Sequence, residues 1–156
     1  MHDLAHLIPH SPPLELIVHV DRLVRPSYPH WVKRLKHPEL ECTGPATYDL
    51  TNIDLWLHTQ RRGTYIYSEL IRAGLIASCL NLQDALAIRR KGLAVFRAVF
   101  GGKVPFFWAS AVEQRGVREL PFRVPFLYES NESVVLGWGS EDDGFTSDNP
   151  ALRFLD

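Results

Sequence analysis

Histidine is the residue type in this sequence best suited to bind a metal or to transfer protons. His2, His6 and His10 recur every four residues, a spacing that would place three imidazoles on one helical face and allow them to share a metal. Pro9 lies within that stretch, and its ring clashes with the preceding helical turn. The remaining histidines have no His-Glu-x-x-His or Cys-x-x-Cys motif beside them. We therefore predict no metal site, and keep as an alternative a small enzyme whose histidines meet only in the folded chain.

The glycine-rich segments match neither a phosphate loop nor a nucleophile motif. Gly101-Gly102-Lys103 is similar to the end of a P-loop, but Arg97 stands where that loop needs a glycine and Val104 where it needs Ser or Thr. Gly137-Trp138-Gly139-Ser140 lacks the Gly-x-Ser-x-Gly spacing of a nucleophile elbow. The carboxylates that follow lack the alternating oxygen ligands of a calcium-binding loop; they are Glu141, Asp142, Asp143 and Asp148. The sequence predicts no cofactor and no recognisable catalytic motif, so we lean away from an enzyme.

Basic residues cluster in the first two thirds of the chain and raise the alternative of nucleic-acid binding. Residues 1–103 contain 13 Lys and Arg against 9 Asp and Glu, whereas residues 104–156 contain 4 against 9, and the net charge is −1. The connection from Gly74 to Asn81 is longer than the turn of a helix-turn-helix motif. We therefore do not favour a nucleic-acid partner. The basic clusters are Lys33-Arg34-x-Lys36, Arg61-Arg62 and Arg89-Arg90-Lys91.

Three of these residues, Arg89, Arg90 and Lys91, are candidate binding residues. On a helical wheel Arg89 falls within an apolar arc, and an unpaired buried charge costs several kcal/mol. We expect a carboxylate or carbonyl partner from the acidic C-terminal part, or a ligand. A kink at Gly92 would instead turn Arg89 towards solvent.

Aromatic residues in the C-terminal third are more numerous than one sheet face requires, and Trp108 and Trp138 are further candidate binding residues. Apolar residues on both faces of the segment after Lys103 indicate one face against the helices and a second face that is also covered. That cover is either the N-terminal segment or a second subunit.

The elements that must position these residues follow from periodicity. Apolar residues four apart predict a helix from Thr64 to Gly74 and another from Leu82, or Asn81, to about Phe100. Proline in a first turn favours a short helix from Pro29 to Lys36. Residues 14–20 are β-rich, and residues 49–58 fit either a short helix or a strand.

After Lys103 the apolar period changes to two and predicts three strands. They run from Val104 to Val112, from Phe122 to Tyr128 and from Ser133 to Trp138, with hairpin-length connections. We predict a single α+β domain over residues 1–156, with an irregular leader at 1–13. Its helical N-terminal two thirds are expected to pack on a mostly antiparallel sheet that ends in a C-terminal three-stranded meander.

Several short motifs recur together in the second half of the chain. They are Cys79-Leu80-Asn81-Leu82-Gln83-Asp84, Gly92-Leu93 with Phe96 and Phe100, Gly102-Lys103, Val124-Pro125-Phe126-Leu127-Tyr128, Trp138 and Asn149-Pro150-Ala151-Leu152-Arg153-Phe154. Together they resemble small uncharacterised bacterial proteins over about residues 40–156. No activity follows from that resemblance, and it implies only a self-contained domain.

Composition places the chain among ordinary globular proteins, with 46% hydrophobic and 22% charged residues. No apolar run approaches the roughly 20 residues needed to cross a bilayer, and the start does not match a secretory signal. Cys42 and Cys79 are expected to be reduced, which favours the cytoplasm. The leading hypothesis is a small, non-enzymatic binding or interaction module whose partner is another protein or a second copy of the chain.

Overall fold

The computed structural model describes residues 14–56, 59–116, 122–140 and 143–155. These residues form three α-helices and ten strands in four sheets, so the prediction of a chain that is helical over its first two thirds is wrong. Prolines at positions 26, 29, 38 and 45 prevent helices from propagating in the N-terminal third. Short strands form there instead, because each pairs with a strand far away in the sequence.

The largest sheet has four antiparallel strands in the order β2-β6-β7-β8. Its two long strands form a hairpin closed by Asn131 and Glu132, whose φ angles of 50° and 60° are those of a tight hairpin turn with two left-handed residues. A strand from the N-terminal half, β2, extends this sheet at the edge of β6. The strands are β2 (Val32–Leu35), β6 (Val112–Gln114), β7 (Phe122–Ser130) and β8 (Ser133–Ser140).

Three two-stranded antiparallel sheets surround the large one. Phe106 joins one of them to the large sheet, because it forms single bridges both with Phe126 on β7 and with Ala151 on β10. The pairs are β1 (Ile17–His19) with β3 (Thr47–Asp49), β4 (Ile53–Trp56) with β10 (Ala151–Phe154), and β5 (Arg61–Arg62) with β9 (Gly144–Phe145).

Two further predictions about individual elements are wrong. The segment from Pro29 to Lys36 contains strand β2, not a helix. Residues 104–111, predicted as the first meander strand, are largely irregular and include a short 3-10 helix at Trp108–Ser110. In this stretch the amides of Phe106 and Phe107 donate to Pro150 and Pro125 respectively, on two different segments. The backbone of residues 104–111 therefore runs between several other elements. Its apolar side chains at 106–111, which the sequence pattern assigned to the two faces of a strand, are instead buried on all sides.

The helices are α1 (Gly63–Arg72), α2 (Leu82–Lys91) and α3 (Leu93–Phe100). The predicted single helix over 82–100 is divided at Gly92, whose φ of 95° and ψ of 175° are accessible essentially only to glycine. Within the described residues, no helix is long and apolar enough to cross a membrane.

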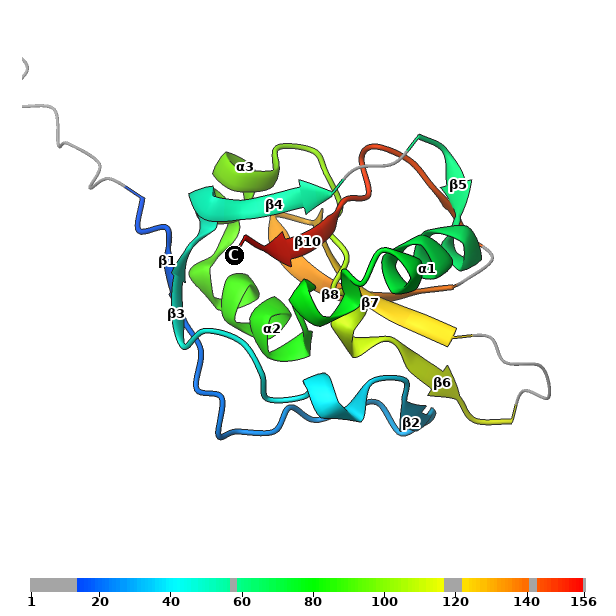
Figure 1. Cartoon of the computed structure of the whole chain (residues 1–156). Coiled ribbons are helices and arrows are strands. Elements are labelled where there is room, and N and C mark those ends of the chain that lie inside the picture. The colour runs from blue at the N-terminus through cyan, green and yellow to red at the C-terminus, as the bar shows by residue number, and fades with distance from the viewer. Residues whose placement is uncertain (1–13, 57–58, 117–121, 141–142, 156) are drawn as a thin grey trace, which may run out of the picture.

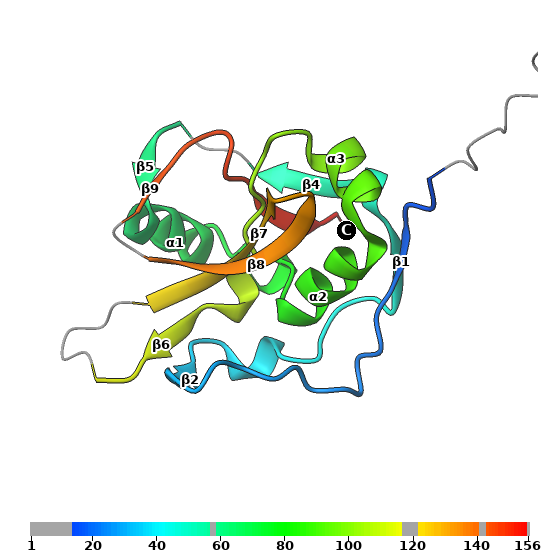
Figure 2. The same ribbon diagram turned by 180° about the vertical axis from the view of Figure 1, so that it is seen from behind.

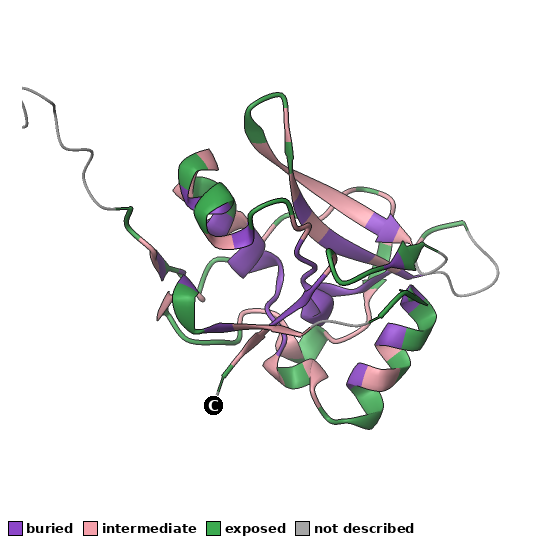
Figure 3. Ribbon diagram, turned by 90° about the horizontal axis from the view of Figure 1, so that it is seen from above, coloured by how far each residue is buried: buried purple, intermediate pink, exposed green. Residues whose placement is uncertain are grey.

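Figures 1 and 2 show the β7–β8 hairpin between α1 on one side and α2 and α3 on the other, with β2 and β6 along the lower edge. Buried residues gather where these elements meet, and the outer faces of α1 are exposed (Figure 3). The buried hydrophobic residues form two groups. The helical core contains Val18, Val20, Leu50, Ile53, Leu80, Leu82, Ala85, Ala87, Ile88, Val95, Phe96, Phe100, Phe107, Leu127 and Leu152. The aromatic core contains Ile66, Leu70, Cys79, Phe106, Trp108, Ala109, Ala111, Phe122, Val124, Phe145 and Ala151.

Strand β7 contributes to both groups because its side chains alternate: Val124 enters the aromatic core and Leu127 the helical core. The aromatic core also needs two glycines on β8. A Cβ atom at Gly137 would lie 2.5 Å from Cζ of Phe126, and one at Gly139 would lie 2.8 Å from Cε2 of Phe106. The rings of Phe126 and Phe106 therefore occupy the space that a side chain at position 137 or 139 would need.

Candidate functional site

Helix α2 begins with a reciprocal cap that also starts a buried polar network. The side chain of Asn81 accepts a hydrogen bond from the amide of Asp84 (3.2 Å), and the Asp84 carboxylate accepts one from the amide of Asn81 (2.9 Å). This arrangement satisfies two donors that a helix start otherwise leaves free. Asp84 is fully buried, so its carboxylate needs further partners.

Arg22 and Tyr48 supply those partners from the N-terminal part of the chain. Nη2 of Arg22 lies 2.7 Å from Oδ1 of Asp84, and the Tyr48 hydroxyl donates to the same oxygen at 2.7 Å. Burial raises the pKa of Asp84, and the Arg22 guanidinium opposes that rise most strongly. Burial, followed by the neighbouring carboxylate, also raises the pKa of Tyr48. The network fastens the N-terminal segment to α2.

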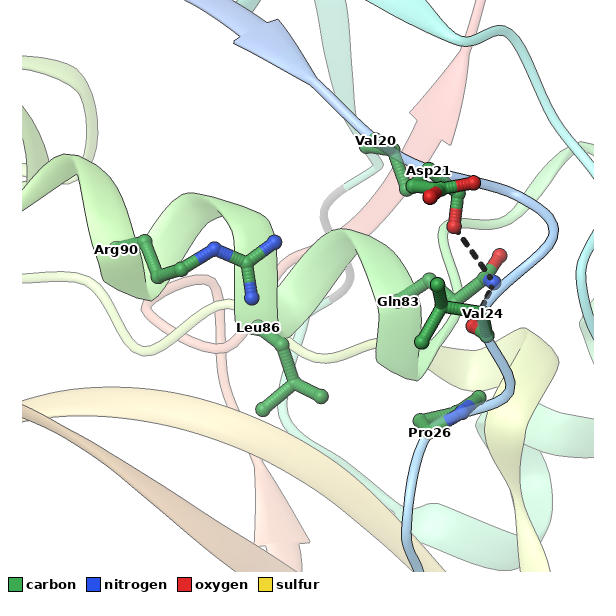
Figure 4. Close-up of a pocket in the computed structure, with 7 residues that line it drawn as sticks. All are labelled: Val20, Asp21, Val24, Pro26, Gln83, Leu86 and Arg90. Atoms are coloured by element: carbon green, nitrogen blue, oxygen red, sulfur yellow. Dashed lines mark hydrogen bonds between the residues drawn. The ribbon is translucent and has the colours of Figure 1, made fainter.

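Gln83 extends the network to the chain that runs across the start of α2. Its Nε2 group donates to the carbonyl oxygen of Val24 at 2.7 Å and to that of Asp21 at 3.4 Å, and its Oε1 accepts from Nη1 of Arg22 at 3.3 Å. Figure 4 shows both Nε2 contacts as dashed lines. Segment 20–26 is thereby held beside the helix with a space between them.

That space is a pocket of about 170 Å³ between segment 20–26 and α2 (Figure 4). Its walls are mainly apolar, and Asp21 and Arg90 add charges of opposite sign. Beside it, Leu23 is 93% exposed and Val24 is 61% exposed, the two most solvent-exposed large apolar side chains of this segment. We call this feature the α2 pocket; it is lined by Val20, Asp21, Val24, Pro26, Gln83, Leu86 and Arg90.

The last turn of α2 contains the predicted binding residues Arg89, Arg90 and Lys91. Arg89 and Arg90 are exposed and Lys91 is half-buried, and none of the three side chains forms an ion pair or hydrogen bond with another described residue. The expected internal partner of Arg89 is therefore not found in the part of the chain that the structure describes. Because α2 ends at Gly92, the wheel that placed Arg89 among the apolar residues does not apply. By contrast, five other arginines form ion pairs within the ranges that the structure covers, namely Arg22, Arg34, Arg72, Arg97 and Arg153.

The two predicted tryptophans occupy different environments. Trp108 is fully buried in the aromatic core, and its indole N–H is the one buried side-chain polar atom among the described residues with no hydrogen-bond partner. It therefore offers no surface to a binding partner. Trp138 is half-buried on β8, where its ring lies 5.3 Å from that of Trp31. Neither lines the α2 pocket, so of the five predicted residues only Arg90 does so.

The described histidines do not converge on a common site. Nε2 of His37 lies 2.6 Å from the Tyr67 hydroxyl, and Nδ1 of His37 lies 3.5 Å from Glu39. His19 contacts Thr47. Within the ranges that the structure covers, no group of three or more His, Cys, Asp or Glu is placed to hold a metal. The predicted His2, His6 and His10 pattern lies outside the described residues.

Sequence reasoning missed Arg22, Tyr48 and Asp84 as a group. The spacing of Asn81 and Asp84 before an apolar run is a readable sign of a helix cap. Nothing in the spacing connects Asp84 to Arg22, which is 62 residues away. The pairing follows only from the path of the chain past the start of α2.

Comparison with known proteins adds no functional residue. The chain matches no protein-family model, no curated protein and no solved structure at a significant level.

Proposed function

We propose that the protein is a non-enzymatic interaction module whose α2 pocket docks a short segment of a partner protein. That segment carries an apolar side chain with carboxylates beside it. The observation that carries this proposal is the mainly apolar α2 pocket, beside which the basic side chains of α2 pair with no carboxylate in the described ranges.

The size and lining of the pocket support an apolar anchor. A volume of about 170 Å³ suits one large aliphatic or aromatic side chain and is too small for a typical cofactor, since ligand pockets usually span about 300–1,000 Å³. Leu23 and Val24 extend the apolar area onto the surface. Apolar side chains grouped in this way on a surface are characteristic of protein contacts.

The charges support acidic residues on the partner. Arg25, Arg89, Arg90 and Lys91 lie beside or within the pocket-lining segments and pair with no described carboxylate. Arg89, Arg90 and Lys91, in the last turn of α2, also stabilise the helix through its dipole. That role leaves them free to attract carboxylates, which would speed association and orient the partner.

Nucleic acid is the second candidate, and the basic last turn of α2 is the observation that favours it. The pocket itself argues against nucleic acid, because its mainly apolar walls suit an apolar side chain and offer little to a phosphate backbone. The connection between α1 and α2 also contains a 3-10 helix at Ile76–Ser78, unlike a helix-turn-helix.

We place this activity in the cytoplasm. Cys42 and Cys79 are both free thiols, as is usual for proteins of a reducing compartment. Chain length, the two adjoining cores and the polar network between distant segments support one domain as the functional unit.

A random peptide library displayed on phage tests the proposal directly. The wild type should enrich peptides in which Asp or Glu flank Leu, Ile, Met or Phe. The charge-reversed variant Arg89→Glu/Arg90→Glu/Lys91→Glu should instead enrich Lys and Arg beside the same apolar residues. Arg61→Glu/Arg62→Glu, on the distant strand β5, is the matched control and should select the wild-type peptides (Figure 1).

A second variant separates the apolar anchor from the charges. Val24→Glu places a carboxylate on a 61% exposed position of the pocket and should abolish peptide enrichment without unfolding the protein. Peptides unaffected by both sets of substitutions would overturn the proposal. Binding of a single-stranded oligonucleotide that the charge reversal removes and Val24→Glu leaves intact would favour the nucleic-acid alternative.

A further inference from the structure

A second pocket lies on the large sheet, beside the pair Trp31 and Trp138. It has a volume of about 380 Å³ and is lined by Trp31, Gln114, Arg123 and Trp138. Gln114, Arg123 and Trp138 come from β6, β7 and β8, and Trp31 immediately precedes β2. Three strands of the sheet and the residue before the fourth thus contribute to what we call the tryptophan pocket.

Backbone hydrogen bonds fix the position of Trp31, and strand pairing fixes that of Trp138. The carbonyl oxygen of Trp31 accepts a hydrogen bond from the amide of Arg115 at 2.7 Å, and Nε of Arg115 donates to His30 at 3.0 Å. Trp138 stands opposite Pro125 in the β7–β8 ladder. The edge of one indole meets the face of the other, with 5.3 Å between centroids and 88° between planes. The aromatic part of the pocket is therefore preorganised.

The polar groups of the pocket are almost entirely donors. Nε of Arg123 donates to Oε1 of Gln114 at 3.0 Å, which occupies the carboxamide's oxygen and fixes the guanidinium plane. The two Nη groups of Arg123, the Nε2 group of Gln114 and both indole N–H groups donate to no other described residue. A ligand that enters must therefore bring acceptors.

The neighbouring charges reinforce that requirement. Glu113, the carboxylate adjacent to Gln114 in the sequence, pairs with Arg34 at 2.7 Å and points to the other face of its strand. Arg123 forms no ion pair with a described carboxylate. A cationic ligand would meet a guanidinium that no described carboxylate neutralises, whereas an anion would pair with it.

We propose that the tryptophan pocket binds a flat, unsaturated group that carries an oxyanion, either a carboxylate or a phosphate. The flat group packs against the indole rings, and the oxyanion accepts hydrogen bonds from the Nη groups of Arg123, whose planar fork suits two oxygens at once. A volume of about 380 Å³ accommodates a two-ring group. This site is separate from the α2 pocket and does not depend on the function proposed for it.

Nuclear magnetic resonance of the indole N–H groups tests the proposal, because the chain has four tryptophans and so four such signals. Trp31→Phe and Trp138→Phe assign the two pocket signals. Titration with 2-naphthoate and with adenosine monophosphate represents the two sources of such a group. We expect at least one of them to shift the Trp31 and Trp138 signals, and to leave the signal of the buried Trp108 in place.

Three matched probes and two variants define the contacts. 2-Naphthalenemethanol lacks the anion, and acetate and inorganic phosphate lack the ring, so each should bind about tenfold or more weakly than the parent ligand. Arg123→Gln should weaken the ligand by a similar factor, and Trp31→Leu should weaken it independently. Arg97→Gln, which removes a surface arginine on α3, should not change binding.

Shifts with 2-naphthoate alone would identify an aromatic carboxylate, and shifts with the nucleotide alone a phosphate-bearing base. The proposal is overturned if neither ligand moves the two signals at millimolar concentration, or if folded Arg123→Gln binds as the wild type does. The triple charge reversal on α2 should leave this titration unchanged, so the two sites can fail separately.

Discussion

Replacing Arg22 with methionine should destabilise the protein by about 3–5 kcal/mol, because it leaves the Asp84 carboxylate buried without its counter-ion. Arg22 is only 12% exposed and Asp84 is fully buried, so water cannot take the place of the guanidinium. Methionine retains most of the apolar stem, and the loss therefore reports on the charge. Against a total stability of about 5–15 kcal/mol, such a loss is large.

The same substitution at Arg34 provides the matched control. Arg34 also lies 2.7 Å from a carboxylate, that of Glu113, but is 62% exposed. Arg34→Met should therefore cost at most about 1 kcal/mol. Guanidinium denaturation followed by tryptophan fluorescence measures both variants, and the midpoints should separate clearly at pH 7 if the slopes are unchanged.

Two further measurements test the reason for the loss. Asp84→Asn in the Arg22→Met background removes the stranded charge, so the double variant should cost less than the two single changes added together. Arg22 lowers the pKa of Asp84, so its removal raises that pKa further, and the variant gains a proton more easily. The difference between wild type and Arg22→Met should therefore shrink as the pH falls from 7 towards 4. A loss below about 1 kcal/mol, or strict additivity, would refute the reasoning.

Three other predictions follow from single contacts. Gly137→Ala places a methyl group 2.5 Å from the Phe126 ring and should destabilise the protein by about 1–3 kcal/mol in chemical denaturation; adding Phe126→Leu should restore part of that stability, and a double variant less stable than Gly137→Ala would contradict the clash. Burial lowers the pKa of His37 below 6.5, so stability should fall as the pH drops below that value, and His37→Gln should remove this component of the pH profile; a His37 titration midpoint above 6.5 by nuclear magnetic resonance would contradict it. Burial raises the pKa of Cys79 to about 12, so iodoacetamide at pH 8 should modify the half-buried Cys42 first, and equal rates in the folded protein would be inconsistent with this burial.

Local signals in the sequence were sufficient where neighbouring residues decide the structure. The helix ends at Gly101, the cap at Asn81 and the hairpin turn at Asn131-Glu132 all follow from short-range backbone chemistry, and each is present. The sequence also indicated that Gly92 would disturb a helix, although not that it would end one.

Tertiary contacts decided the rest. Strand β2 is a strand because β6 pairs with it from some 80 residues away, and residues 104–111 are irregular because their amides bond to different segments. The same holds for the candidate sites. The sequence singled out Arg90 and Trp138 by type alone, but Asp21 and Val24 lie beside Arg90 only because Gln83 holds segment 20–26 against α2. Residue spacing determines what repeats along one helix or strand, whereas long-range pairing has no periodic signature and determines which surfaces meet.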